Sequence, residues 1–112
     1  MKAAAVVLMT FGLAYATVAT ASDRVSDLDY LKANRCKGLA VGLASGDTSA
    51  LDAMIKAQGR SRSDAVLVRA DEEMSRAKHE AARPELKDRL NAELSGACVA
   101  YMGGGKEVAA GR

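Results

Sequence analysis

Two cysteines, Cys36 and Cys98, are the residues of this 112-residue sequence with the clearest chemical potential. They do not form the C-x-x-C pair that is typical of thiol redox sites and zinc sites. The chain also has a single histidine, which leaves an ordinary zinc ligand set incomplete. In an exported protein, an even number of cysteines favours a disulfide. We therefore expect a structural bridge that closes a loop of roughly 60 residues and adds about 4 kcal/mol of stability; two separate buried thiols are the alternative.

The single histidine, His79, is the next candidate for chemistry. Histidine is the side chain whose charge changes most readily near neutral pH, so His79 could sense pH. A pairing of His79 with Met54, Met74 or Met102 could hold a haem, but methionines at these spacings are common core residues. The C-x-x-C-H sequence that attaches haem covalently is absent. We expect His79 to have a structural or neutral role, and the sequence predicts neither a metal site nor a cofactor.

Catalytic signatures are weak in the rest of the chain. The sequence contains no G-x-S-x-G nucleophile motif. The carboxylates of Asp71, Glu72 and Glu73 are adjacent, so on a helix they point apart and are expected on a solvated face. Gly103-Gly104-Gly105 follows a predicted helix, whereas a phosphate-binding loop leads into one. We therefore predict that the protein is not an enzyme.

Three arginines, Arg60, Arg62 and Arg69, lie in and just after one polar connector. They could form a patch that binds an acidic partner or a phospholipid head group; a hydrated loop is the alternative. The two tyrosines of the predicted domain, Tyr30 and Tyr101, are distant in sequence from this connector. Because base stacking needs aromatic side chains and the net charge is only +2, we do not expect nucleic-acid binding.

The first 21 residues resemble a secretory signal peptide. Met1 and Lys2 precede an apolar run over residues 3–19, which ends at the small-x-small triplet Ala19-Thr20-Ala21. This layout predicts cleavage after Ala21 and a periplasmic or secreted protein. The alternative is a membrane anchor formed by residues 3–19, a run at the lower limit of the length that spans a bilayer.

The remaining chain is long enough for one small domain. We predict a helical domain over residues 22–102 and a flexible tail over residues 103–112. The whole sequence is 49% hydrophobic but only 4% aromatic, so the core must be rich in small side chains. Such a core buries little apolar area and needs additional stabilisation, which the disulfide would supply.

Apolar residues recur at three- and four-residue steps in four segments, which predicts an all-α fold. The segments run from a Ser26 cap to about residue 45 before Gly46, from Thr48 or Ser49 to Gly59, from a Ser63 cap toward Pro84, and from Pro84 to Gly103. Their apolar positions are Leu28, Leu31, Cys36, Leu39 and Leu43; Leu51, Met54 and Ile55; Leu67, Ala70, Met74, Ala77 and Ala81; and Leu86, Leu90, Leu94, Ala97, Cys98 and Tyr101.

Pro84 either begins the last helix or kinks the one before it, so the fold is a small four-helix or three-helix bundle stapled by one disulfide. The bridge would join the first helix to the last. Gly38 and Gly42 form a G-x-x-x-G pair. This pair predicts a close approach, either to a neighbouring helix of the same chain or to a second copy in a homodimer.

These features favour a small exported helical protein that acts by contact with another protein. The plan is similar in architecture to acid-stress chaperones of the periplasm and to immunity proteins that neutralise type VI secretion amidases, although no residue motif carries either likeness. Acid would act on the carboxylates of Asp71, Glu72, Glu73 and Glu80 in the first case. A haem or metal carrier is the alternative from another class.

Overall fold

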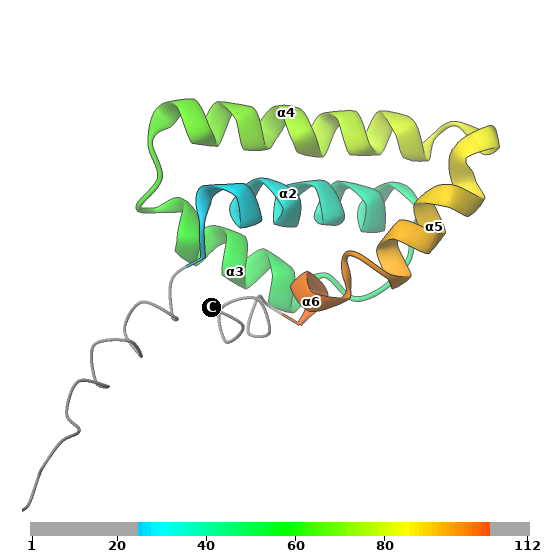
Figure 1. The fold of residues 1–112 in the computed structure, drawn as a ribbon, viewed down its shortest axis with the longest axis horizontal. Coiled ribbons are helices and arrows are strands. Elements are labelled where there is room, and N and C mark those ends of the chain that lie inside the picture. Colours follow the sequence, from blue (N-terminus) through cyan, green and yellow to red (C-terminus); the bar gives the residue numbers. More distant parts are fainter. Residues whose placement is uncertain (1–24, 104–112) are drawn as a thin grey trace, which may run out of the picture.

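The computed structural model describes residues 25–103, and all regular structure in this range is helical. The elements are α2 (Asp27–Gly42), α3 (Ser49–Gly59), α4 (Asp64–Ala81), the 3₁₀ turn η1 (Pro84–Leu86), α5 (Lys87–Ser95) and α6 (Val99–Met102) (Figure 1). The predicted all-α class is therefore confirmed. The predicted signal peptide, its alternative as an anchor, and all of the predicted tail except Gly103 lie outside the described residues.

Helix α2 is the centre of the domain. It lies between α4 and α3, and the α5–α6 segment runs back along it from its C-terminal end toward its first turns (Figure 1). Buried residues therefore occur around most of its circumference, among them Tyr30, Ala33, Cys36 and Leu39. A helix that is covered on several sides shows no single apolar stripe.

One predicted core position of α2 is wrong. Leu28 falls on the same face as Leu39, yet it is 59% exposed whereas Leu39 is fully buried. Leu28 lies in the first turn of α2, where the neighbouring helices do not cover it. Helical spacing identifies a face of a helix, but not how far along the helix its neighbours extend.

The two glycines of α2 make the contact with α4. A Cβ atom built on Gly38 would lie 2.5 Å from the Met74 carbonyl oxygen and 2.8 Å from the Ala77 Cβ, and one on Gly42 would lie 2.6 Å from the Ala81 Cβ. Both distances to Cβ are shorter than any ordinary contact, so only glycine lets the two backbones approach this closely. Of the two predicted roles, Gly38 and Gly42 thus serve helix packing within the chain.

The predicted helix starts are confirmed at two serines. The Ser26 hydroxyl oxygen accepts a hydrogen bond from the Asp29 N–H at 3.1 Å, and the Ser63 hydroxyl oxygen accepts one from the Val66 N–H at 3.3 Å. Each bond satisfies one backbone donor that the first helical turn leaves without a partner. At the start of α3, the Asp47 carboxylate instead accepts from the Ser49 N–H at 2.9 Å.

The end of α2 comes earlier than predicted. The helix stops at Gly42, and the chain turns through Ala44, whose φ is +53°, before it reaches Gly46, whose φ is +85°. A left-handed conformation at alanine is uncommon, and the sequence gives no signal for it. The glycine at 46 is part of the same turn but does not set the helix end.

The last predicted helix is divided into three pieces. Pro84 begins the 3₁₀ turn η1, so it starts a new element and does not kink α4. Helix α5 then ends at Ser95, and Gly96, with φ −110° and ψ −87°, separates it from α6. The break at Gly96 changes the chain direction, so Cys98 and Tyr101 both return to the core.

The disulfide between Cys36 and Cys98 is present, with the two Cα atoms 5.7 Å apart. It connects α2 to the turn between α5 and α6 and closes a separation of 62 residues. The buried cluster around it is rich in small side chains: Ala33, Cys36, Leu39, Ala40, Leu51, Met54, Ala77, Ala81, Leu90, Leu94, Cys98 and Tyr101. The fold is thus the predicted small helical bundle with one internal staple.

Candidate functional site

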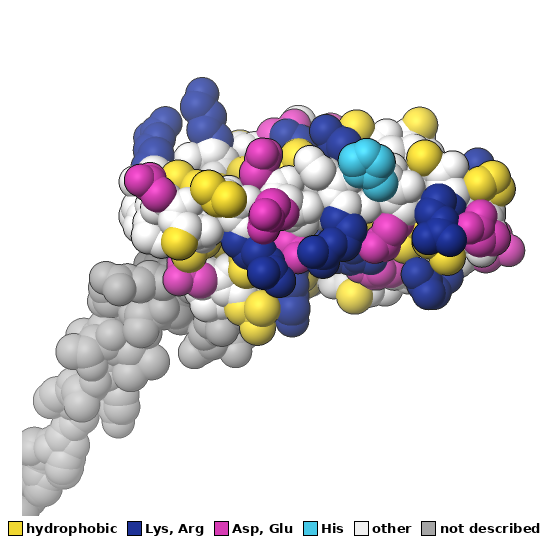
Figure 2. Space-filling model, turned by 90° about the horizontal axis from the view of Figure 1, so that it is seen from above, with side chains coloured by type: hydrophobic (Ala, Val, Ile, Leu, Met, Phe, Trp, Pro, Cys, Tyr) yellow, Lys and Arg dark blue, Asp and Glu magenta, His cyan; other side chains and the backbone are white. Residues whose placement is uncertain are grey.

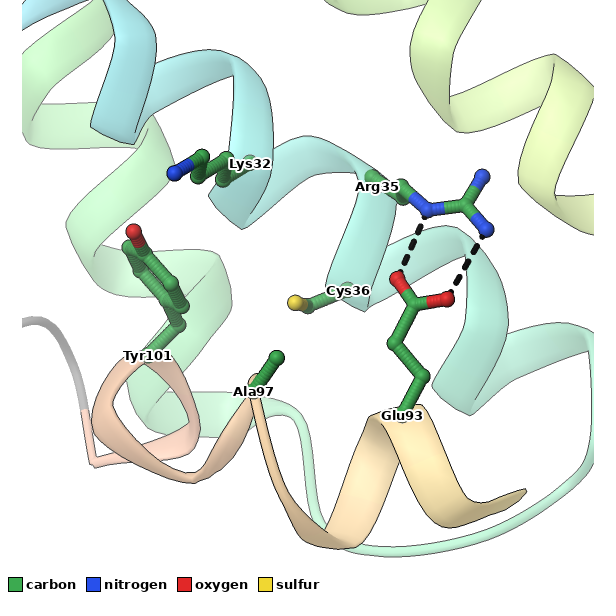
Figure 3. A pocket seen from close by; sticks show the side chains of 6 residues that line it. All are labelled: Lys32, Arg35, Cys36, Glu93, Ala97 and Tyr101. Carbon is green, nitrogen blue, oxygen red and sulfur yellow. Dashed lines mark hydrogen bonds and ion pairs between the residues drawn. The ribbon is translucent and has the colours of Figure 1, made fainter. Parts of the chain in front are cut away.

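A pocket of about 260 Å³ lies between α2 and the α5–α6 segment (Figure 3). It is lined by Lys32, Arg35, Cys36, Glu93, Ala97 and Tyr101. The first three residues come from two adjacent turns of α2, and the other three come from α5, the turn after it, and α6. The pocket therefore exists only because the break at Gly96 brings the end of the chain back onto α2.

An ion pair forms one end of this pocket. The Arg35 guanidinium donates to both carboxylate oxygens of Glu93, at 2.7 and 3.0 Å, and also to the Glu80 carboxylate at 3.0 Å. Figure 3 shows the fork between Arg35 and Glu93. The hydrogen bond to Glu93 is the main reason why the pKa of Arg35 is raised above its usual value. Arg35 thus remains charged and ties α2 to both α4 and α5.

A buried hydrogen bond forms the other end. The Tyr101 hydroxyl donates to Asp29 Oδ1 at 2.8 Å, and the Ser26 hydroxyl donates to the other oxygen of the same carboxylate at 2.9 Å. Asp29 is only 6% exposed, so these donors replace the water that its carboxylate loses on burial. Burial also raises the pKa of Tyr101, which keeps the phenol neutral and able to donate.

The disulfide lies between these two ends. Cys36 lines the pocket, and its partner Cys98 directly follows the lining residue Ala97. The two sides of the pocket are therefore joined by an ion pair, a covalent bond and a buried hydrogen bond. Because each of these links spans α2 and the α5–α6 segment, the pocket is held open in one geometry.

Among the charged residues that line the pocket, Lys32 makes no polar contact that stabilises the fold of residues 25–103. It is exposed, and it forms no hydrogen bond or ion pair with any residue between 25 and 103. In Figure 3 its ammonium group lies on the same side of the pocket as the Tyr101 hydroxyl. A cation beside an apolar hollow can receive a carboxylate from outside the chain.

Two other hollows occur in the described part of the chain. One of about 370 Å³ is lined by Val25, Gln58, Ser61 and Arg62, and one of about 410 Å³ is lined by Ser45, Gly46, Asn91, Leu94, Ser95 and Met102. Hydrogen bonds from Arg62 to Val25 and Gln58 cross the first hollow, but a disulfide joins the walls of the pocket beside Lys32 and of neither other hollow. We therefore take the Lys32 pocket as the candidate site.

The three predicted patch arginines do not act together. Arg62 turns inward: it pairs with Asp27 at 2.6 Å, donates to the Gln58 side chain at 2.8 Å and to the Val25 carbonyl, and covers the Tyr30 ring at 5.2 Å. Its side chain is only 10% exposed. Arg62 thus closes the domain around the start of α2, and a patch that includes it is not formed.

The other two arginines remain at the surface. Arg69 pairs along α4 with Glu73 at 3.4 Å, and its side chain is 58% exposed. Arg60 is exposed and makes no ion pair within residues 25–103. Because Arg62, which lies between them in sequence, points inward, Arg60 and Arg69 do not form one continuous basic surface.

His79 lies exposed on the outer face of α4 (Figure 2). Its Nδ1 atom is 2.8 Å from the Ser75 carbonyl oxygen of the same helix, so the ring is held against its own backbone. Of its suggested partners, Met54 is buried, and Met74 and Met102 are half-buried. Residues 25–103 contain no group of three or more His, Cys, Asp or Glu side chains that could hold a metal ion.

The predicted carboxylate ladder of α4 has mixed roles. Glu73 pairs with Arg69 and Arg76 on its own helix. Glu80, predicted with these carboxylates as a group on which acid would act, pairs with Arg35 of α2, and its side chain is 24% exposed. The spacing of charges along one helix could not show that Glu80 bonds across to another helix.

Sequence reasoning missed Arg35, Glu93 and Lys32 as site residues. The sequence did contain a sign of the Arg35–Glu93 pair, because Arg35 directly precedes one cysteine and Glu93 lies five positions before the other. Once a bridge between the cysteines is expected, these opposite charges must lie close together. Lys32 lies one turn earlier on the same face of α2, which places it beside the same junction.

Comparison of the chain with protein-family models, with curated proteins and with solved structures finds no significant match. Within residues 25–103, no helix combines the length and the apolar character that crossing a membrane requires.

Proposed function

We propose that this chain is a small exported helical protein that acts by contact with another protein. The observation that carries the proposal is on α4. This helix buries three alanines, Ala70, Ala77 and Ala81, while Val68 on the same helix is 61% exposed. Folding alone gains from burying the larger apolar side chain, so an exposed valine above an alanine-filled core favours a use outside the fold.

Other large apolar side chains repeat this arrangement. Leu28 and Val41 of α2, Leu67 of α4 and Val99 of α6 are between 37% and 59% exposed. Figure 2 shows apolar side chains lying among charged ones on the face above α4. Apolar area with a charged surround is the usual composition of a non-obligate protein interface.

The charges that could serve catalysis support the same proposal. Arg35, Arg62 and Asp29 are all engaged in bonds that hold helices together. The cysteines are joined to each other. A disulfide in a small domain is also typical of an oxidising compartment, which supports export.

Site-specific crosslinking tests this function. A photoreactive benzoylphenylalanine is placed at Val68, the chain is expressed in its own cells, and the exported fraction is irradiated. The chain should then form a covalent adduct with one partner protein in stoichiometric amount. The same group at exposed Ala57 of α3, which lies on the other side of α2 from α4, is the matched control and should give little product. Equal, diffuse labelling from both positions, or none from either, would contradict the proposal.

One alternative within this class is favoured by a specific observation. Glu80 and Glu93 are the carboxylates that hold Arg35 between α4 and α5, so their protonation would weaken the junction in the way that an acid-stress chaperone requires. Such a protein should bind hydrophobic dye more strongly at strongly acidic pH than at neutral pH. An immunity protein should show no such increase and should retain a single tight partner. No observation favours a haem or metal carrier.

A further inference from the structure

The pocket between α2 and the α5–α6 segment has the features of an anchoring site. Its Cys36 and Ala97 lining is apolar, and it lies next to the Tyr101 ring and the Arg35 guanidinium (Figure 3). Aromatic rings pack well against both of the latter groups. At about 260 Å³ it is smaller than the usual site for a drug-sized ligand. It is therefore suited to a single large side chain whose parent molecule makes further contacts around it.

The rim of the pocket carries one charge without a partner in the fold. Lys32 is exposed and is engaged by no other residue between 25 and 103, whereas Arg35 is already neutralised by Glu80 and Glu93. Leu28, 59% exposed, lies one turn before Lys32 on the same face of α2. The rim thus presents an apolar side chain and a cation in line with the hollow.

The site is also preformed. The disulfide, the Arg35–Glu93 fork and the Tyr101–Asp29 hydrogen bond each connect one wall of the pocket to the other. A site that is already ordered loses little conformational entropy when it is filled. In protein interfaces, most of the affinity comes from a few large side chains that enter such hollows.

We propose that this pocket binds an aromatic side chain of the partner protein, with a neighbouring carboxylate of the same partner segment on Lys32. The inference rests on the proposed function and names the partner's chemistry: an aromatic residue next to an acidic one. It also adds a contact face, formed by α2, α5 and α6, to the α4 face that carries Val68.

A capped dipeptide tests the assignment without knowledge of the partner. The full chain, purified with its disulfide intact and labelled with ¹⁵N, is titrated with acetyl-Phe-Glu-amide and followed by amide chemical shifts. Shifts should concentrate at Lys32, Cys36, Ala97 and Tyr101. Acetyl-Phe-Gln-amide should bind about 2- to 5-fold more weakly, the range expected for one exposed ion pair.

Two pairs of variants make the test specific. Lys32→Glu should reverse the preference, so that acetyl-Phe-Lys-amide binds more tightly than the Glu peptide, whereas Lys56→Glu makes the same charge change on α3 and should alter nothing. Ala97→Leu should fill the hollow and abolish the shifts, whereas Ala92→Leu on exposed α5 should leave them intact. Ala97 and Ala92 are both exposed, so neither change disturbs the core.

The outcomes separate the two proposals. Shifts at other faces, or a charge preference that Lys32→Glu leaves unchanged, overturn the pocket assignment. If a protein adduct still forms at Val68 in that case, the contact function stands without this site. If the dipeptide binds as expected but benzoylphenylalanine in place of Leu28, on the pocket rim, gives no partner adduct, the pocket is a site for free aromatic carboxylates and the partner-anchoring role is overturned.

Discussion

At the scale of single residues, the fold depends on a few polar groups that are buried in pairs. Asp29 is a helix-start carboxylate of an ordinary kind, yet it is almost fully buried because Ser26 and Tyr101 both donate to it. Without those donors, the buried carboxylate would cost several kcal/mol in lost hydration. The position of Tyr101 is therefore set by a partner 72 residues away in sequence, and not by its own helix.

Tyr101 gives a prediction for alkaline pH. Burial raises its pKa in the folded state, while a tyrosine in the unfolded chain ionises near pH 10. The unfolded state therefore loses its proton first as pH rises. The stability that Tyr101 contributes is fully present below about pH 10 and is lost as pH rises through the folded-state pKa.

Tyr101→Phe is the variant that checks this. At pH 7 it should lower the free energy of unfolding by about 1–3 kcal/mol, because Asp29 loses a donor. Between pH 10 and 12 the variant should lose less further stability than the natural chain. Urea unfolding across this range measures both effects, and parallel pH curves for the two proteins would show that Tyr101 is not the responsible group.

At the scale of helices, the contact between α2 and α4 is set by backbone proximity. The Cβ that alanine would add at Gly42 lies 2.6 Å from the Cβ of Ala81. Alanine is a better helix former than glycine by about 1 kcal/mol, but overpacking a close contact costs about 1–3 kcal/mol. The steric cost should exceed the gain in helix propensity.

A double-mutant cycle tests the packing of α2 on α4. Gly42→Ala should destabilise the protein, and adding Ala81→Gly should recover part of the loss, because it removes the atom that the new methyl group meets. A coupling energy of about 0.5–2 kcal/mol is expected from thermal or urea unfolding. Gly103→Ala is the control, since no atom lies within 4 Å of its added Cβ. Strictly additive single effects would contradict the close approach.

Most of the helix pattern could be predicted from the sequence, because caps and periodicity are local properties. Ser26 and Ser63 begin their helices as predicted, and Pro84 begins a new element. The breaks that were missed depend on tertiary contacts. Gly96 could have continued a helix, but the return of Cys98 to α2 requires the chain to turn there.

The candidate site was less predictable for a related reason. Its members come from positions 32–36 and 93–101, and only the disulfide brings these segments together. Arg60, Arg62 and Arg69 were predicted to form a patch because they are close in sequence. Arg62 is instead drawn inward by Asp27, Gln58 and Tyr30, and no local pattern encodes that choice.

At the scale of the whole molecule, the domain divides into two parts of unequal packing. Helices α2 and α4 lie side by side along most of their length (Figure 1). The α5–α6 segment is attached to α2 by a smaller contact, where the bridge, the Arg35–Glu93 pair and the Tyr101–Asp29 bond are concentrated. Covalent and polar links thus add to the apolar packing of Leu90 and Leu94 at this junction.

Removal of the disulfide should make the α5–α6 segment less stable than the pair of helices α2 and α4. A domain of this size is stable by only about 5–10 kcal/mol, and a disulfide that closes about 60 residues contributes about 4 kcal/mol of it. The double variant Cys36→Ser with Cys98→Ser should therefore lose a large share of the total stability. The loss should fall first on the α5–α6 segment, because α2 and α4 keep their glycine–alanine contact.

Hydrogen exchange measures this order directly. In the variant, amides of residues 87–102 should lose protection before those of residues 27–42 and 64–81, since local openings follow local contact density. The Lys32 pocket should vanish together with protection of residues 87–102, because one of its walls is that segment. Simultaneous loss of protection in all helices would instead mean that the bundle is a single cooperative unit, in which the bridge stabilises every helix alike.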